Sequence, residues 1–184
     1  MTATTLDPKT ALVVVDIQQG TGYLPIAPHS VDDVVTRSAE LAAAFRAKGL
    51  PVVFVHVTGN APGRIEGNPR RGNPPAGWSD LAPGLGVEES DIIVTKQVWG
   101  SFFGTDLDLQ LRRRGVTQVV LTGVATSLGV ESTARAAHEH GYNVTVVTDA
   151  VTDIDEDAHR NSIEKIFPKL AEIDTTDAIV KLLG

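Results

Sequence analysis

Short apolar runs alternate with amphipathic segments along the whole chain. The runs are rich in Val and Ile and lack regular polar interruptions, which is typical of strands buried on both faces of a parallel sheet. Six runs of this kind occur, separated by loops or by helix-like segments. The predicted strands are 11–15, 51–57, 91–95, 118–121, 143–147 and 170–173.

Apolar residues recur at helical spacing between these runs. The pattern is clearest in 31–48, where Ser30 is a candidate N-cap and Gly49 a candidate stop. The predicted helices are 31–48, 106–114, 129–140, 155–166 and 175–182. Strands that alternate with helices predict an α/β fold around a parallel sheet. Because the chain shows no internal repeat and no sign of a second domain, we expect one domain over residues 1–184.

One stretch, 58–86, breaks the alternation of strands and helices. It contains many Gly, Pro and Asn residues and shows no strong periodicity. A loop of this length inside a compact domain is usually functional or disordered. We expect it to cover a site or to form an oligomer contact.

Composition and charge favour a soluble globular protein over a nucleic-acid-binding or membrane protein. Of the 184 residues, 42% are hydrophobic and 21% are charged, as in soluble globular chains. The net charge of −7 argues against a nucleic-acid partner, and we interpret the basic run 112–114 as charge complementarity at a helix end. No apolar run approaches the roughly 20 residues of a membrane span. Residues 1–5 also lack the pattern of a signal peptide, so we expect a cytoplasmic protein with no membrane partner.

Cysteine is absent from the sequence. This absence excludes disulfides, thiolate zinc sites and a cysteine nucleophile. The five histidines are scattered, and His138 and His140, two positions apart on a predicted helix, point to different faces. We therefore expect neither a metal site nor a cofactor.

Chemically useful residues follow three of the predicted strands. Asp16 and Gln18 follow the first strand, Lys96 the third, and a glycine-containing turn, 122–129, the fourth. Each feature alone is more often structural, and the sequence contains no G-x-S-x-G elbow, no Walker A loop and no G-x-G-x-x-G after the first strand. However, ligands of open parallel sheets bind at the carboxyl ends of the strands. The combination on one edge therefore favours a site.

Three segments carry a resemblance that covers nearly the whole chain. They are ALVVVDIQ (11–18), VTKQVWGSF (94–102) and LTGVATSLGVESTAR (121–135). In order and spacing they resemble the isochorismatase-like hydrolases, a cysteine hydrolase superfamily that includes nicotinamidases and carbamoyl amidases. The resemblance implies a single-domain, doubly wound three-layer α/β fold with a six-stranded parallel sheet. It also implies an Asp, Lys, Cys triad, in which Asp16 and Lys96 match the first two members and Gly129 stands at the position of the nucleophilic cysteine.

The missing cysteine changes the chemistry that the resemblance implies. Amide hydrolysis in the family passes through a thioester, which requires a thiolate. Gly129 has no side chain, so the cysteine amidase mechanism is impossible in this chain. The family's oxyanion hole maps onto the backbone N–H groups of Ala125 and Gly129, beside a cis peptide near 124–125. A helix N-terminus binds anions whatever side chain it carries.

Isochorismatases of this superfamily also work without a cysteine, by hydrolysing a vinyl ether. On that resemblance Asp16 is a general acid that protonates the enol-pyruvyl carbon before water attacks. Lys96 would orient the substrate carboxylate or the water, and Gln18 would hold Asp16. The leading hypothesis is therefore a hydrolase that acts on a small anionic substrate. Isochorismate, cleaved to pyruvate and a dihydroxybenzoate precursor, is the named candidate.

Three of the nine aromatic residues of the Phe, Trp and Tyr types follow Lys96 closely: Trp99, Phe102 and Phe103. One interpretation is packing in the core or in a dimer. The other is an aromatic wall that binds a flat substrate.

Two other functions remain open from the sequence. One is a catalytically inactive binding or scaffold homologue, and a weaker one is an amidase that uses Ser127. A buried Asp16 with a raised pKa favours the enzyme, whereas a site filled by Trp99 or Phe103 favours the scaffold. The serine amidase requires the Ser127 hydroxyl within hydrogen-bond reach of Asp16 or Lys96. The expected partners are a small-molecule substrate and further copies of the chain, in a homodimer or a larger homo-oligomer.

Overall fold

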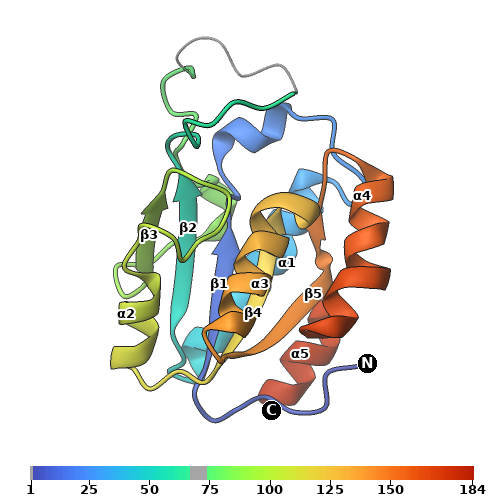
Figure 1. Ribbon diagram of the computed structural model, residues 1–184. Coiled ribbons are helices and arrows are strands. Elements are labelled where there is room, and N and C mark those ends of the chain that lie inside the picture. Colours follow the sequence, from blue (N-terminus) through green and yellow to red (C-terminus); the bar gives the residue numbers. More distant parts are fainter. Residues whose placement is uncertain (1, 67–73) are drawn as a thin grey trace.

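Six parallel strands form one sheet in the computed structural model, in the order β3-β2-β1-β4-β5-β6 (Figure 1). The structure describes residues 2–66 and 74–184. The strands are β1 Thr10–Val15, β2 Val52–Val57, β3 Ile92–Lys96, β4 Gln118–Val124, β5 Asn143–Thr152 and β6 Glu172–Asp174. All neighbouring strands pair in parallel. Their carboxyl ends therefore meet at one edge of the sheet.

Helices cover both faces of this sheet (Figure 1). They are α1 Val31–Ala47, α2 Leu107–Arg113, α3 Glu131–Glu139, α4 Glu156–Asn161 and α5 Thr176–Leu183. Side chains of β1 alternate between two core layers: Val13 packs in the layer formed with α2 and α3, and Val14 in the layer formed with α1 and α5. Two-sided burial explains why the strands are apolar throughout. The predicted doubly wound three-layer fold with a six-stranded parallel sheet is confirmed.

β4 extends beyond its predicted end at residue 121, because tertiary contacts accommodate Thr122 and Gly123. The buried Thr122 hydroxyl accepts a hydrogen bond from the Ser38 hydroxyl of α1 at 3.0 Å. Gly123 has a φ of +130°, and a Cβ atom there would lie 2.0 Å from the Val15 carbonyl oxygen of β1. Glycine thus lets β4 run close beside β1 as far as the carboxyl edge.

Two predicted helices contain π-helical turns. The segment predicted as one helix over 129–140 consists of the π-helical turn η3, Thr126–Val130, followed by α3. The segment predicted over 155–166 consists of α4 followed by a second such turn, η4, Ser162–Ile166. Turns of this kind occur frequently at functional sites. Short 3₁₀ helices lie at Gln19–Tyr23 (η1), Pro83–Leu85 (η2) and Phe167–Lys169 (η5). Within the described ranges, no helix is long and apolar enough to cross a membrane.

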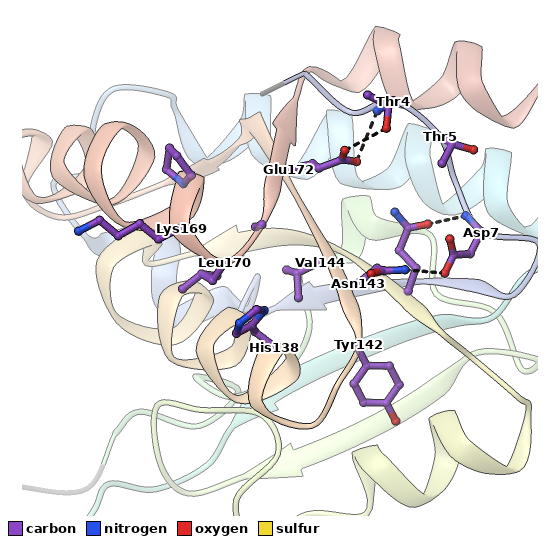
Figure 2. A pocket seen from close by; sticks show the side chains of 13 residues that line it. Thr4, Thr5, Asp7, His138, Tyr142, Asn143, Val144, Lys169, Leu170 and Glu172 are labelled. Carbon is purple, nitrogen blue, oxygen red and sulfur yellow. Dashed lines mark hydrogen bonds between the residues drawn. The ribbon is translucent and has the colours of Figure 1, made fainter.

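A cavity of about 410 Å³ lies at the amino edge of the sheet, beside the first residues of β4, β5 and β6 (Figure 2). Its two carboxylates already have partners within the protein. Asp7 accepts hydrogen bonds from Thr117 and Asn143, and Glu172 accepts one from the Thr4 hydroxyl. The cavity thus lies at the edge opposite to the predicted site, and its acidic groups hold the N-terminal segment against the domain.

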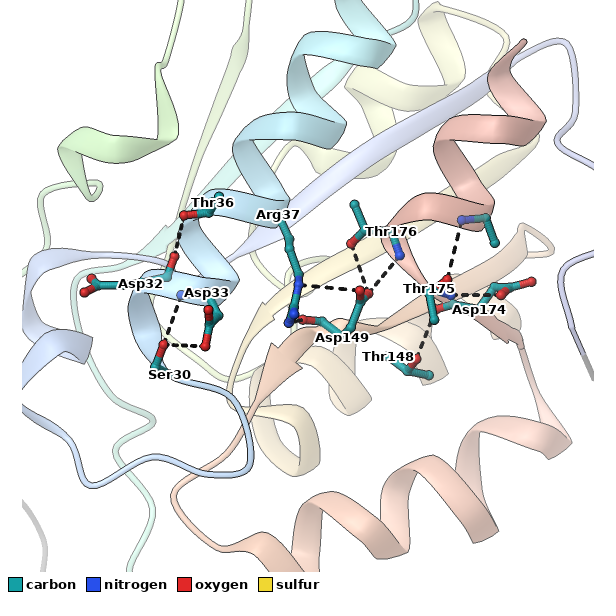
Figure 3. A network of polar contacts seen from close by, with 11 residues as sticks. Ser30, Asp32, Asp33, Thr36, Arg37, Thr148, Asp149, Asp174, Thr175 and Thr176 are labelled. Atoms are coloured by element: carbon teal, nitrogen blue, oxygen red, sulfur yellow. Dashed lines mark hydrogen bonds and ion pairs between the residues drawn. The ribbon is translucent and has the colours of Figure 1, made fainter.

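A polar network centred on Asp149 of β5 joins this strand to α1 and α5 (Figure 3). Asp149 accepts hydrogen bonds from the Thr176 backbone N–H at 2.8 Å and from the Thr176 hydroxyl at 3.0 Å. Its other carboxylate oxygen lies 3.5 Å from Arg37 Nε. Ser30 caps α1 by accepting a hydrogen bond from the Asp33 N–H, as its position predicted. These contacts tie the two helices of this layer to the sheet.

Candidate functional site

Asp16 and Lys96 form an ion pair at the carboxyl edge of the sheet. Asp16 directly follows β1 and Lys96 ends β3, so the lysine side chain spans the intervening strand β2. Lys96 Nζ lies 2.7 Å from Asp16 Oδ2, and the lysine side chain is fully buried. The ammonium also donates to the backbone carbonyl of Trp99. The structure thus brings together the two ionisable residues that sequence reasoning expected at one edge.

The second carboxylate oxygen of Asp16 is unusual. Oδ1 is buried and has no hydrogen-bond partner within the described part of the chain. Asp16 is also the one non-glycine residue among those described with a positive φ, 53°. L-residues occupy this left-handed region at a cost, and such residues cluster at functional sites. A buried acceptor that has no partner in the protein is free to bond to water or to a bound molecule.

Burial dominates the acidity of Asp16. Loss of hydration raises the pKa of this carboxyl to about 6, although the charge and hydrogen bond of Lys96 and the nearby His56 lower it. Because Oδ2 accepts the lysine hydrogen bond, Oδ1 is the oxygen that carries the proton in the neutral form. The site therefore holds a carboxyl group that gains and loses its proton near pH 6.

Gly129 lies directly beside this carboxylate. A Cβ atom built on Gly129 would lie 2.9 Å from Asp16 Oδ2 and 3.3 Å from both the Val124 carbonyl oxygen and Val15 Cγ1. Any side chain at this position therefore requires Asp16 to move. The peptide bond between Val124 and Ala125 is cis, as the resemblance implied. Because glycine has no side chain, it leaves room for the Asp16 carboxylate in its observed position.

Contrary to expectation, no hydrogen bond joins the Gln18 side chain to the Asp16 carboxylate in the described part of the chain, although the Gln18 backbone N–H donates to the Asp16 carbonyl oxygen at 3.1 Å. Its amide Nε2 donates to the carbonyl oxygens of Val57 and Trp78 at 3.2 and 3.1 Å, and its Oε1 accepts from the Val57 N–H at 3.0 Å. The side chain is buried and its amide is fully used by these backbone groups. Gln18 therefore ties the end of β2 to the loop around Trp78.

Of the predicted loop 58–86, residues 67–73 lie outside the described residues.

His56 is a neighbour of the site that sequence reasoning missed. It lies near the end of β2, between the strands that carry Asp16 and Lys96. Its ring nitrogens contact the Ser79 carbonyl oxygen at 2.7 Å and the Thr95 hydroxyl at 2.8 Å. Its place near the carboxyl end of a predicted strand was the signal that could have found it.

The three aromatic residues after Lys96 have different environments. Phe102 is buried in the core, with ring centroids 5.1 Å from His140 and 6.0 Å from Tyr142. Tyr142 immediately precedes β5, at the amino edge, so Phe102 fits the first of the two interpretations, packing in the core, and not the aromatic wall. Trp99 and Phe103 are 59% and 78% exposed, so neither ring fills the site.

The first two residues of η3, Thr126 and Ser127, make their hydrogen bonds away from the ion pair. Thr126 Oγ1 lies 2.8 Å from His159 Nδ1, and the Ser127 N–H donates to Asp153 Oδ2 at 2.6 Å. Within the described residues, no hydrogen bond joins the Ser127 hydroxyl to Asp16 or Lys96. No group of three or more His, Asp or Glu side chains suited to a metal ion occurs in residues 2–66 and 74–184.

Known proteins resemble this chain in both sequence and structure. The sequence pattern of the isochorismatase domain matches residues 10–178. The uncharacterized isochorismatase family protein YecD of Escherichia coli O157:H7 is 43% identical, over 95% of this chain and 96% of that protein. Ureidoacrylate amidohydrolase RutB of Methylobacterium radiotolerans is 34% identical, over 97% of this chain and 81% of that protein. A solved isochorismatase family protein from Burkholderia thailandensis has a TM-score of 0.93 at 48% identity, covering 97% of each chain. With its domain matched over nearly its full length, the chain belongs to the isochorismatase family.

Proposed function

We propose that this protein is a hydrolase that uses Asp16 as a general acid and forms no covalent intermediate with its substrate. The observation that carries the proposal is the buried Asp16 carboxyl, whose pKa is raised to about 6 and whose Oδ1 has no hydrogen-bond partner among the described residues. Glycine at position 129 and the absence of cysteine from the chain support a route without a thioester.

The substrate class is a small anionic vinyl ether, of which isochorismate is the named candidate. The Oδ1 proton passes to the enol-pyruvyl carbon, and the ether oxygen stabilises the resulting oxocarbenium ion. Water adds to this cation and returns a proton to Asp16. The hemiketal then breaks down to pyruvate and an alcohol, the dihydroxybenzoate precursor. An acid with a pKa near the working pH suits this step, because it is both available and strong enough to donate.

Lys96 has two roles in this proposal. Its ammonium occupies Oδ2, which leaves the proton on Oδ1, and it stabilises the carboxylate that remains after proton transfer. The ammonium also orients the water or the substrate carboxylate.

The turn beside Asp16 supplies the anion site in this proposal. The backbone N–H groups of Ala125 and Gly129 bind the negative charge of the substrate, as N–H groups at helix starts do for other anions. The closeness of Gly129 to Asp16 Oδ2 supports a ligand that contacts both. Trp99 and Phe103, both exposed, provide flat surfaces for the substrate ring.

The two alternatives have less support. An inactive scaffold is expected to have a site filled by its aromatic residues, whereas Trp99 and Phe103 are exposed and Asp16 is buried. A serine amidase requires a hydrogen bond from the serine hydroxyl to Asp16 or Lys96, and within the described residues the Ser127 hydroxyl makes no such bond. The proposed enzyme acts in the cytoplasm.

The experiment that tests the proposal is pyruvate release from isochorismate, followed by a coupled assay. The wild-type protein is expected to release pyruvate, and Asp16→Asn is expected to reduce the rate at least about 100-fold, the usual contribution of a general acid. Asp177→Asn, which removes an exposed carboxylate on α5, is the matched control and should retain the rate. Absence of release by the wild-type protein would remove isochorismate as the substrate.

A further inference from the structure

The turn η3 is attached to three neighbouring elements. The Thr133 hydroxyl of α3 donates to the Gly129 carbonyl oxygen at 2.6 Å. Asp153, which follows β5, accepts from the Ser127 N–H at 2.6 Å. The first residue of the turn, Thr126, is bonded to His159 of α4 at 2.8 Å. The first two attachments involve backbone groups of the turn, whereas the third joins two side chains.

The Thr126–His159 contact is buried and belongs to no other site. Thr126 is fully buried, and His159 is 7% exposed. Neither residue contacts Asp16 or Lys96 in the described structure, so the general-acid chemistry does not explain the pair. A buried hydrogen bond between two side chains is costly to break, because each group is then left without a partner.

We propose that Thr126 and His159 are positioning residues, whose hydrogen bond holds η3 so that the Ala125 and Gly129 N–H groups face the substrate. In this arrangement the Thr126 hydroxyl donates a hydrogen bond to Nδ1 of neutral His159. The catalytic consequence rests on the proposed function, whereas the mechanical role of the pair does not.

The proposed bond depends on the protonation state of the imidazole. A neutral ring accepts at one nitrogen, but a charged ring donates at both. In protonated His159, Nδ1 carries a hydrogen that points at the hydrogen of the Thr126 hydroxyl. The hydrogen bond would then form only if the hydroxyl rotated to accept. In addition, protonation would put a charge into a buried position.

The surroundings of His159 favour the neutral ring. Burial lowers its pKa, and His29, whose ring lies edge-on at 6.2 Å, lowers it further. Asp153 and Glu156 act in the opposite direction, but burial is the largest cause. On the α3 side, Glu131 is already paired with Arg135 and with the Ser162 hydroxyl.

Amide hydrogen exchange of the full-length protein, without substrate, tests the positioning role. Thr126→Val and His159→Leu are expected to speed exchange of the amides of residues 127–130 about tenfold or more, while the amides of β1 stay protected. Thr126→Ser restores the hydroxyl, and His159→Asn places an amide oxygen near the position of Nδ1, so both should restore protection. Thr148→Val, which removes a hydroxyl hydrogen bond to the Asp174 carbonyl, is the matched control.

The dependence of exchange on pH distinguishes positioning from plain stability. After correction for intrinsic exchange, protection of residues 127–130 should fall in the wild-type protein at pH values below the ordinary histidine range. This fall should be absent in His159→Asn. Unchanged exchange in Thr126→Val, an equal loss of protection in β1, or failure of both conservative variants to rescue would each overturn the proposal.

Turnover of isochorismate is the second readout. Thr126→Val should lower kcat/KM about tenfold, and Thr126→Ser should recover it. If no variant releases pyruvate but the exchange pattern is found, the positioning role stands and the named substrate fails.

Discussion

At the scale of single residues, the chemistry of the site follows from the environment of Asp16. Its carboxyl is buried beside the Lys96 ammonium, and within residues 2–66 and 74–184 one of its oxygens has no hydrogen-bond partner. Burial outweighs the ion pair, which is why the pKa rises to about 6 instead of falling. A buried ion pair of this kind contributes little to net stability, because removing both charges from water offsets most of their attraction.

The raised pKa of Asp16 predicts how stability depends on pH. A carboxyl whose folded-state pKa lies above its unfolded value of 3.8 adds stability that is fully present below about pH 4 and is lost as pH rises through about 6. The loss amounts to about 3 kcal/mol. Urea unfolding of the wild-type protein and Asp16→Asn across this range measures it. A difference in unfolding free energy between the two proteins that does not vary with pH would contradict the shifted pKa.

Position 129 should tolerate side chains poorly. In Gly129→Ala the new methyl group would press against Asp16 Oδ2, so we expect a loss of about 1–3 kcal/mol in the free energy of unfolding. Gly22→Ala is the control, because a Cβ atom at Gly22 meets nothing within 4 Å. Denaturant titration compares the two variants. Equal stability of Gly129→Ala and the wild-type protein would show that the carboxylate has room to move.

At the scale of elements, contacts between neighbouring strands and helices determine where a strand ends, and the hydrophobic pattern of the strand alone does not predict this. The run 118–121 predicted the start of β4 but not its end, because Thr122 and Gly123 are accommodated by Ser38 and by the close approach of β1. Asp16 and Lys96 were predictable as neighbours, since carboxyl ends of parallel strands share an edge.

Side-chain directions in irregular segments were less predictable. Trp99, Phe102 and Phe103 lie where no periodicity marks the inward positions, and only Phe102 turns into the core. Similarly, nothing in the sequence assigned the Gln18 amide to the Val57 and Trp78 backbone, because an amide bonds equally well to many partners.

The close contact of β4 with β1 gives a prediction for Gly123. Gly123→Ala combines an unfavourable φ of +130° with a Cβ atom 2.0 Å from the Val15 carbonyl oxygen. We expect a loss of about 4 kcal/mol or more in the free energy of unfolding, or failure to fold. Gly63→Ala, where a Cβ atom has open space, should fold normally. Thermal unfolding followed by circular dichroism provides the comparison, and normal stability of Gly123→Ala would refute the packing argument.

At the scale of the whole molecule, the two helix layers leave the edge strand β3 and the segment after it partly uncovered. Ile93, Trp99 and Phe103 are exposed there. Large apolar side chains that are exposed in one chain are common at contacts between proteins.

We therefore expect the protein to form a homodimer or a larger homo-oligomer, as the sequence led us to propose. Sedimentation equilibrium should give a mass at least twice that of one chain, and Phe103→Asp should shift the distribution toward monomers. A wild-type protein that is monomeric at all concentrations would refute this expectation.

The pH dependence of pyruvate release from isochorismate tests the central claim most directly. If Asp16 donates the proton, kcat must fall as pH rises through the pKa of the group in the complex, which is about 6 in the free protein. Asp16→Asn should show no such limb and no significant rate. Turnover that persists in Asp16→Asn, or a wild-type protein that releases no pyruvate at any pH, would contradict the account.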